Sequence, residues 1–456
     1  MTAPRGGDEL AAALAAVLGA RTVTGLQRIT AGASRETWAF DADDRALVLR
    51  RDPPGLPQPE GMRREAECFR AAAAVGIPVP ALVAAGDGSD AVGTPYLVLA
   101  RLEGETLPTR LLREDRFAAA RAGLARELGR VLARIHAIDP GKVPSLDRVD
   151  DRLARLRAEH DAFGEPRPAV EAGLRWLADH PPVATAPAVV HGDFRHGNLL
   201  VGEDGLRGVL DWELAHVGDP REDLGWMCAR VWRFGAAPEV GGFGSREDLF
   251  AGYDEVAGAA PDPAAVHWWE VFACVHWAVI CRMQAQRHLS GAEPSVELAV
   301  LGRRAVEAEH DALLLLGLVE PGTTLPDEPC PSDSVAPHPV RPPTDRPTVD
   351  ELLAAVEGFL VDELEPADDR SRYLARVART SLAVVRRELA LGPGLQRDHA
   401  AALARTGCHD DAELAAGLRS GTLRLDDEAV AAAVRSGTLG RLAVANPRYP
   451  ITRPRR

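Results

Sequence analysis

The sequence predicts an α+β protein in which a small β-sheet region precedes a mainly helical region and a separate C-terminal all-α domain. Three observations support this order. Residues 21–51 alternate polar and apolar side chains with the period of two that strands have. From Arg116 onward, apolar residues recur at helical spacing instead. Between residues 320 and 347, nine prolines interrupt both patterns, which indicates a linker.

The first region, residues 1–105, is expected to fold as a small sheet with helices beside it. Three strand-like runs separated by turns form a β-meander, and the apolar residues of the following helix recur on one face. An apolar strand closes the region. In order, the expected elements are a helix at 8–19, the meander at 21–51, a helix at 60–75 and a strand at Tyr96–Ala100.

The second region, residues 106–319, is expected to be mainly helical. Two short apolar runs in its middle, Ala188–Val190 and Leu206–Leu210, are expected to be strands. Several tryptophans lie on the helix at 264–290, and we interpret them as core packing. The expected helices cover 116–136, 150–160, 166–180, 246–258, 264–290 and 295–317.

The last region follows the linker at 320–347 and covers residues 348–456. An amphipathic helix is expected to begin after Thr348, its candidate N-cap. Two copies of an Arg-Ser-Gly-Thr-Leu motif place Gly421 and Gly437 as candidate helix stops. The further expected helices cover 370–391, 395–406, 411–419 and 426–435.

Composition excludes several classes of protein. A net charge of -14 argues against broad nucleic-acid binding, which needs a basic surface. The six cysteines include no CxxC pair, so neither a zinc site nor a disulfide framework is expected. The apolar run Leu10–Ala20 is too short to span a membrane. We therefore expect a cytoplasmic protein with no nucleic-acid or membrane partner.

The segment from Val189 to Trp226 carries the chemistry. Asp193 is a carboxylate that could accept a proton from a hydroxyl group, and it stands in the loop HGDFRHGN. Asn198 follows five positions later and Asp211 eighteen positions later, and both offer the hard oxygen ligands that Mg²⁺ prefers. An aspartate, four spacers and an asparagine is the catalytic-loop spacing of protein kinases. This set of side chains suits phosphoryl transfer.

Neighbouring side chains are expected to support this set. Arg195 could stabilise charge that develops on the phosphoryl oxygens. His191 is interpreted as a scaffold residue, and Asp219 and Asp223 as acids that hold the loop rather than as catalysts. For His196 two interpretations stay open, a substrate contact or a solvated loop residue.

These motifs resemble those of the aminoglycoside phosphotransferase family. The matching blocks are HGDFRHGNLL and VLDWELAHVGDPREDLGW, and the resemblance covers about residues 20–320. Within the family, HGDFR, LVLRRDPPG and DWE are similar to the branch of kinase domains attached to acyl-CoA dehydrogenases. The region after the linker resembles a small helical domain of unknown function that accompanies some of these phosphotransferases.

The resemblance implies a two-lobed, protein-kinase-like fold with ATP between a β-sheet lobe and a helical lobe. It makes Asp193 the catalytic base, assisted by Arg195, and it makes Asn198 and Asp211 the Mg²⁺ ligands. Its nucleotide-binding residues would be Gly32 and Ser34 in the phosphate-covering loop, Arg50 in place of the usual lysine, Glu65 or Glu67 as the partner of Arg50, and Leu99 to Leu102 at the adenine hinge.

The implied reaction is transfer of the γ-phosphate of ATP to a hydroxyl group of a small molecule, with Mg²⁺ as cofactor. The branch suggests a hydroxyacyl-CoA as the acceptor. Aminoglycosides, macrolides and amino alcohols are the alternatives. A nucleotide-binding regulatory module without turnover is a further alternative, and the intact set of Asp193, Asn198 and Asp211 argues against it. The partner of the C-terminal helical domain and the oligomeric state are not indicated by the sequence.

Overall fold

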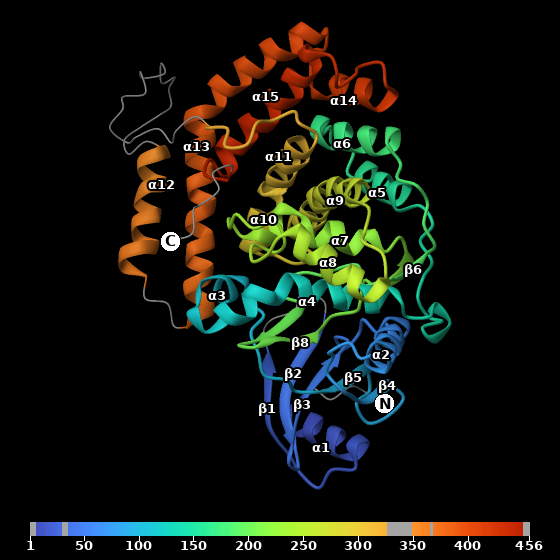
Figure 1. Ribbon diagram of the computed structural model, residues 1–456. Coiled ribbons are helices and arrows are strands. Elements are labelled where there is room, and N and C mark those ends of the chain that lie inside the picture. Colours follow the sequence, from blue (N-terminus) through green and yellow to red (C-terminus); the bar gives the residue numbers. More distant parts are fainter. Residues whose placement is uncertain (1–5, 30–34, 326–348, 365–367, 450–456) are drawn as a thin grey trace. The chain divides into compact units, whose positions relative to one another are not determined.

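We examined a computed structural model of the chain (Figure 1). The structure describes residues 6–29, 35–325, 349–364 and 368–449. Contacts divide the chain into two compact units. Unit 1 contains residues 1–150 and 182–270, and unit 2 contains residues 151–181 and 271–456.

Unit 1 begins with a five-stranded antiparallel sheet in the order β1-β2-β3-β5-β4. The predicted meander supplies the first three strands and the predicted strand at Tyr96–Ala100 is β5, whereas β4 was not predicted. The elements are α1 (Gly7–Leu18), β1 (Val23–Ile29), β2 (Glu36–Ala42), β3 (Arg45–Arg51), α2 (Pro59–Ala74), β4 (Leu82–Asp87) and β5 (Pro95–Ala100).

Each face of this sheet is covered by a helix, because successive side chains of a strand point to opposite faces. Val98 of β5 joins a core cluster with Leu10 and Leu14 of α1. Leu97 and Leu99, its neighbours on the strand, join a second cluster with Met62 and Phe69 of α2. The same second cluster continues into α4 and the loop HGDFRHGN, so the sheet and the helical part of unit 1 share one core.

The rest of unit 1 is helical apart from two strand pairs. β6 pairs with β9, and β7 pairs with β8, each antiparallel. The elements are α3 (Pro108–Arg113), η1 (Asp115–Phe117), α4 (Ala118–His136), η2 (Pro140–Lys142), β6 (Ala188–Val190), β7 (Leu199–Gly202), β8 (Gly205–Val209), β9 (His216–Gly218), α7 (Arg221–Cys228), η3 (Arg230–Arg233), α8 (Arg246–Ala257) and the start of α9 (Pro263–Leu289).

α4 and α8 cross in unusually close contact because two glycines let their backbones meet. A Cβ atom at Gly129 of α4 would lie 2.0 Å from the carbonyl oxygen of Leu249, and one at Gly252 of α8 would lie 1.9 Å from that of Arg126. No side chain fits at either position. This crossing fixes α8 against α4, which shares a core cluster with the loop HGDFRHGN.

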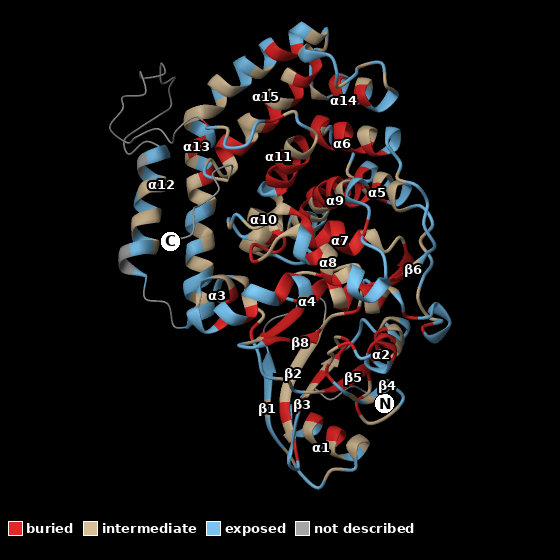
Figure 2. Cartoon of the chain, in the orientation of Figure 1, coloured by how far each residue is buried: buried red, intermediate tan, exposed pale blue. Residues whose placement is uncertain are grey.

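Unit 2 is all-helical in the residues that the structure describes, and it joins two stretches that are far apart in sequence. Its helices are α5 (Arg152–Asp161), α6 (Pro168–Asp179), the remainder of α9, α10 (Val296–Arg303), α11 (Ala305–Leu315), α12 (Val349–Gly358), η4 (Phe359–Glu363), α13 (Asp369–Thr406), α14 (Asp411–Ser420) and α15 (Glu428–Ala445). α11 is buried along most of its length (Figure 2).

The α9 helix is long and apolar enough to be compared with a membrane span. Its most apolar 18-residue window is 72% buried inside the protein. That burial matches the prediction that its aromatic residues form core packing, since Trp268, Trp269 and Phe272 are all buried.

Three details of the helical prediction are wrong. The single helix expected at 295–317 is divided at Arg304 into α10 and α11. The helices expected at 370–391 and 395–406 are one helix, α13, which continues through Pro393. Gly421 does end α14 in the left-handed conformation, but Gly437 lies inside α15, where a Cβ atom would come within 2.8 Å of the His399 ring. The close approach of α13 there explains that glycine.

The domain boundaries expected from the sequence, 1–105, 106–319, 320–347 and 348–456, stay predictions. The grouping by contacts divides the chain differently, because residues 151–181 and the C-terminal helices fall in the same unit. The expected linker at 320–347 lies almost wholly outside the described residues.

Candidate active site

The loop HGDFRHGN follows β6 and is shaped by two glycines. Gly192 has a φ of 79°, and a Cβ atom there would lie 2.5 Å from the carbonyl oxygen of Leu214. Gly197 has a φ of 90°. Left-handed backbone at these positions favours glycine. Between them, Phe194 is fully buried in the core of unit 1 and anchors the loop.

The carboxylate of Asp193 receives three side-chain donors. The amide nitrogen of Asn198 donates to Oδ2 at 2.7 Å. The Arg195 Nε donates to Oδ1 at 2.8 Å, and the indole Nε1 of Trp226 donates to the same oxygen at 3.0 Å. Charge-assisted hydrogen bonds of this kind hold a carboxylate in one orientation. The structure therefore brings Asp193, Arg195 and Asn198 together as the motif suggests.

Arg195 is itself fixed in place. Its Nη1 donates to the carbonyl oxygen of His196 at 2.7 Å, and its guanidinium stacks 4.6 Å from the centre of the Trp232 ring. Trp232 in turn lies against Trp226, with ring centres 5.3 Å apart. A tryptophan face attracts a guanidinium cation. The two tryptophans thus form a frame for both Arg195 and Asp193.

Asp223 and His191 hold the backbone of the loop. Asp223 accepts hydrogen bonds from the backbone N–H groups of His191 at 2.8 Å and Gly192 at 2.9 Å, and it also contacts His136. The Nδ1 of His191 accepts from the backbone of Asp193, so its Nε2 carries the proton that is donated to the Leu210 carbonyl at 3.0 Å. These contacts agree with the interpretation of both residues as scaffold.

His196 is neither of the two things that the sequence left open. Its side chain is buried, and its Nε2 lies 2.6 Å from the carbonyl oxygen of Gly241. Burial lowers the pKa of His196 to about 4, although the hydrogen bond to Gly241 acts in the opposite direction. A buried, neutral histidine tied to a backbone carbonyl is a structural residue.

Arg50 on β3 lies between two carboxylates. Its Nη1 is 2.8 Å from Glu65 on α2, and its Nη2 is 2.8 Å from Asp211. Glu67, the other candidate partner, instead accepts from the hydroxyl of Ser145 at 2.8 Å. Alternation along β3 separates Arg50 from its neighbour Arg51, which pairs with Glu36.

A second arginine, Arg35, joins this cluster. It forms ion pairs with Glu65 and, at 3.4 Å, with Asp52. Burial lowers the pKa of Arg35, and the nearby charge of Arg50 lowers it further. Two guanidinium groups thus share the fully buried Glu65 carboxylate, which concentrates positive charge beside Asp211.

Asp211 has a strained backbone. Its φ of 60° is in the left-handed region, where few residues other than glycine occur and where aspartate is among the better tolerated. The following residue, Trp212, is fully buried against Phe69 of α2 and His191, so packing maintains this conformation. Burial acts to raise the pKa of Asp211, but the charge and hydrogen bond of Arg50 outweigh it and hold the pKa below its usual value.

The donor set at this point fits a divalent metal ion. Carboxylate oxygens of Glu65, Asp211 and Glu213 lie within 4.8 Å of one another. The side-chain amide nitrogen of Asn198 donates to Asp193, which leaves the amide oxygen as an acceptor. The backbone N–H of Leu210, the residue before Asp211, donates to the carbonyl oxygen of Asn198 at 2.8 Å. Because Glu65 already holds two arginines and Asp211 only one, Asp211, Asn198 and Glu213 would be the better oxygen ligands for Mg²⁺.

The remaining predicted nucleotide residues are placed as follows. Leu99 is buried on β5, and Leu102 follows the end of that strand, where its side chain lies beside Gly208 of β8. Gly32 and Ser34 lie outside the described residues. Sequence reasoning missed Trp226, Arg35 and Glu213. The acid directly after Asp211-Trp212 was a usable signal for Glu213, whereas nothing local pointed to the other two.

Comparison with known proteins assigns the chain to a family. A model of the phosphotransferase enzyme family (APH) matches residues 25–259, more than half of the 456 residues. The chain belongs to this phosphotransferase family. The family membership confirms the predicted resemblance and its enzyme class. A second model, for a domain of unknown function (DUF6285), matches residues 365–449 of the phosphotransferase.

Individual relatives include proteins named for the expected branch. Acyl-CoA dehydrogenase family member 10 of Mus musculus is 30% identical over 227 residues, which cover 46% of this chain and 21% of that protein. Family member 11 of Gallus gallus is 28% identical over 215 residues, which cover 44% of this chain and 27% of that protein. The matched stretch thus spans only about a quarter of the length of these relatives.

A solved structure confirms the fold class. A Ralstonia eutropha protein assigned as an aminoglycoside phosphotransferase superposes with a TM-score of 0.57 at 21% identity, covering 69% of this chain and 99% of that one. At that identity the likeness supports the kinase-like fold and nothing about the substrate.

Proposed function

We propose that the phosphotransferase transfers the γ-phosphate of ATP to a hydroxyl group of a small molecule, with Asp193 as the catalytic base. The observation that carries the proposal is the fixed orientation of the Asp193 carboxylate by Asn198, Arg195 and Trp226. A carboxylate with three donors cannot rotate freely, so an acceptor hydroxyl that binds to it is held in one direction. Positioning of the nucleophile is a main contribution that proteins make to phosphoryl transfer.

Each side chain then has a defined part. Asp193 orients the hydroxyl group and takes its proton as the new P–O bond forms. Arg195 faces the developing charge of the phosphoryl oxygens from a position fixed by Trp232. Arg50, fixed by Glu65, would contact the phosphates of the nucleotide when it is bound. Gly32 and Ser34 would cover those phosphates, and Leu99 to Leu102 would bind adenine.

Mg²⁺ and ATP fit the donor set beside Asp211. Asp211 and Asn198, with Glu213, would hold the metal through carboxylate and amide oxygens. When bound, Mg²⁺–ATP supplies the phosphoryl group and the metal neutralises part of its charge. Because Arg50 contacts Asp211 at 2.8 Å, we expect this arginine to change partner when the nucleotide binds.

For the acceptor we propose a hydroxyacyl-CoA. The relatives that the chain matches are named as acyl-CoA dehydrogenase family members, so an acyl thioester is the acceptor chemistry nearest to their names. Aminoglycosides, macrolides and amino alcohols are the competing acceptors. The cytoplasmic location expected from the sequence belongs to the same proposal.

The test is an acceptor panel followed by mass spectrometry. Purified protein is incubated with ATP and Mg²⁺ and with hydroxyacyl-CoAs, aminoglycosides, macrolides or amino alcohols, and matched acyl-CoAs that lack the hydroxyl group are the control. We expect a singly phosphorylated product from the hydroxyacyl-CoAs alone. A product from aminoglycosides instead would overturn the acceptor but not the reaction. ATP binding without product from any acceptor would favour a regulatory module.

A further inference from the structure

Unit 2 contains four carboxylates that are almost completely buried on α6 and α11. Glu171 lies on α6, and its relative exposure is 2%. Glu307, Glu309 and Asp311 lie on α11, and none is more than 2% exposed. Carboxylates are rarely buried to this degree unless cations or hydrogen-bond donors accompany them.

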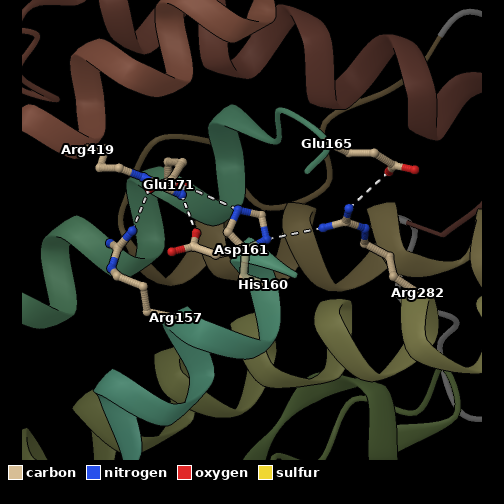
Figure 3. A network of polar contacts seen from close by, with 7 residues as sticks. All are labelled: Arg157, His160, Asp161, Glu165, Glu171, Arg282 and Arg419. Carbon is tan, nitrogen blue, oxygen red and sulfur yellow. Dashed lines mark hydrogen bonds and ion pairs between the residues drawn. The ribbon is translucent and has the colours of Figure 1, made fainter. Parts of the chain in front are cut away.

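Glu171 receives partners from two separate stretches of the chain (Figure 3). From its own side, Arg157 donates at 3.1 Å and His160 lies at 3.2 Å. From the C-terminal side, Arg419 of α14 contacts Glu171 and also Asp161. Burial acts to raise the pKa of Glu171, but the hydrogen bonds from His160, Arg419 and Arg157 lower it to about 2. The carboxylate is thus ionised and fully engaged.

The three carboxylates of α11 also receive partners from two separate stretches of the chain. Each contacts a residue from 151–325 and also a residue from the C-terminal helices or the segment after α15. Glu307 contacts Arg304 at 2.9 Å and Asn446 at 2.8 Å. Glu309 contacts Arg167 at 3.2 Å and Arg441 at 3.1 Å. Asp311 contacts His310 and the hydroxyl of Tyr449.

Apolar contacts also join α6 and α11 to the C-terminal helices. Ala169 and Ala172 of α6 and Leu313 of α11 share one buried cluster with Leu403 of α13 and Leu414 and Leu418 of α14, among others. A second cluster joins Val306 and Leu325 to Leu442 and Ala443 of α15. The carboxylates are therefore flanked by packed hydrophobic side chains and are buried, although the side chains of Arg419 and Arg441 are still 46% and 31% exposed.

A metal ion is a poor alternative for part of this network. His160, Asp161 and Glu171 have metal-ligand chemistry and lie close together. However, Arg282 donates to the Nδ1 of His160 at 3.1 Å, and Arg157 and Arg419 occupy Glu171. Arginine cations already compensate the negative charge that would attract a metal.

We propose that the C-terminal helices α13 to α15 and the short segment after α15, all within the domain of unknown function, are an intramolecular binding module for the acid-bearing face of α6 and α11. Its recognition elements are Arg419, Arg441, Asn446 and Tyr449, each of which completes one buried carboxylate. The module holds α5, α6 and α11 in place. This role is independent of the proposed reaction, because none of these residues belongs to the candidate active site.

The proposal is tested on the full chain by inserting a specific protease site between residues 326 and 347 and cleaving it. We expect the two fragments of the wild-type sequence to stay together in size-exclusion chromatography. With Arg419→Ala and Arg441→Ala combined, they should separate, or the α5, α6 and α11 peptides should exchange amide hydrogens at least about tenfold faster.

The matched control is Arg397→Ala combined with Arg424→Ala, which removes two exposed arginines from the same module. The two fragments of the control variant should stay together, and its α5, α6 and α11 peptides should exchange amide hydrogens at the wild-type rates. If the double variant does not fold, Arg419→Lys with Arg441→Lys keeps the charge and should give an intermediate exchange rate. Separation of the wild-type fragments, or equal behaviour of the test and control variants, would contradict the proposal. Neither readout depends on phosphoryl transfer.

Discussion

The orientation of the Asp193 carboxylate depends on three side-chain donors. Two of its donors, Arg195 and Asn198, come from the same loop, and the motif alone was sufficient to name them. The third donor, Trp226, is 33 residues away in sequence and approaches only because α7 follows β9 back toward the loop. An indole N–H has no sequence pattern that links it to a distant carboxylate, so this contact could not be predicted.

Removing the Trp226 donor should slow the reaction without weakening substrate binding. In Trp226→Phe an aromatic ring is kept but the indole N–H is lost, so Asp193 loses one of the two donors to its Oδ1. We expect kcat to fall roughly tenfold while KM for ATP is unchanged, since a tenfold change corresponds to about 1.4 kcal/mol. Trp176→Phe, the same change on α6, is the control and should keep wild-type kinetics. An unchanged kcat in Trp226→Phe would refute the positioning role.

The arginine at position 50 matches the composition of the whole chain, in which lysine is almost absent. Of the 53 basic residues only Lys142 is a lysine, so arginine at the position where kinases carry lysine requires no special explanation. The pairing with Glu65 was one of two options in the sequence, and the tertiary structure selects it because Glu67 faces Ser145 instead.

The scarcity of lysine permits a direct test of Arg50. In Arg50→Lys an acyl-phosphate analogue of ATP, which acylates lysines near bound phosphates, should modify residue 50, and free ATP should prevent the modification. In the wild-type protein any labelling should be confined to the exposed Lys142 and should be insensitive to ATP. Peptide mass spectrometry separates the two sites. ATP-insensitive labelling of residue 50, or none at all in a variant that still binds ATP, would place the phosphates elsewhere.

Among the elements, α13 departs most from its prediction. Two helices were expected, at 370–391 and 395–406, yet α13 is one helix of 38 residues that continues through Pro393. Both halves are anchored: Val384 and Arg387 are buried before the proline and Ala402 and Leu403 after it, and Arg387 donates to the carbonyl of Val444 at 2.7 Å. Pro393 itself is exposed, so water can satisfy the carbonyl that loses its helical partner. Local propensity was overruled by tertiary contacts.

Pro393→Ala should therefore stabilise the protein. The substitution restores a backbone N–H to an exposed turn whose two ends are already fixed. We expect the free energy of unfolding to rise by about 1–2 kcal/mol. The substitution removes the destabilising effect of proline inside a helix, but it also makes the unfolded chain more flexible, which offsets part of the gain. Urea unfolding measures the change, and Leu389→Ala on the same exposed turn is the control. A loss of stability would mean that the helix requires the proline geometry.

At the scale of the whole molecule, the sequence indicated the order of regions but not how distant segments combine. Residues 151–181 and the C-terminal helices belong to one unit, although the family model of the phosphotransferase includes the first and excludes the second. The reason lies in residues such as Glu307, Glu309 and Asp311. Acidic residues in a helical sequence pattern predict a solvent-exposed face. Here they are buried because the fold brings cations and hydrogen-bond donors from distant segments to them.

Glu171 makes this arrangement sensitive to acid. Its pKa is lowered from the usual 4.5 to about 2 in the folded protein. The stabilisation is therefore complete above the unfolded-state pKa and is lost as the pH falls from about 4.5 toward 2. Glu171→Gln should reduce the free energy of unfolding by up to about 3 kcal/mol at pH 6, and this difference should shrink by pH 3.

Urea unfolding at both pH values checks this, with Glu159→Gln as the control because its pair with Arg155 lies at the surface. Surface pairs contribute little, so the control should show a small difference at either pH. A difference between wild-type and Glu171→Gln proteins that is the same at pH 6 and pH 3 would show that the carboxylate charge does not stabilise the fold.

The most direct measurement is a comparison of phosphorylated product and ADP formed by the wild-type protein and by Asp193→Asn at saturating ATP, Mg²⁺ and hydroxyacyl-CoA. Asparagine keeps the size of the side chain and removes its basicity. If Asp193 is the base, ADP and product form in equal amounts in the wild type, and both fall by at least about a hundredfold in the variant, with its thermal stability intact. Wild-type rates of product formation by Asp193→Asn would contradict the assigned site.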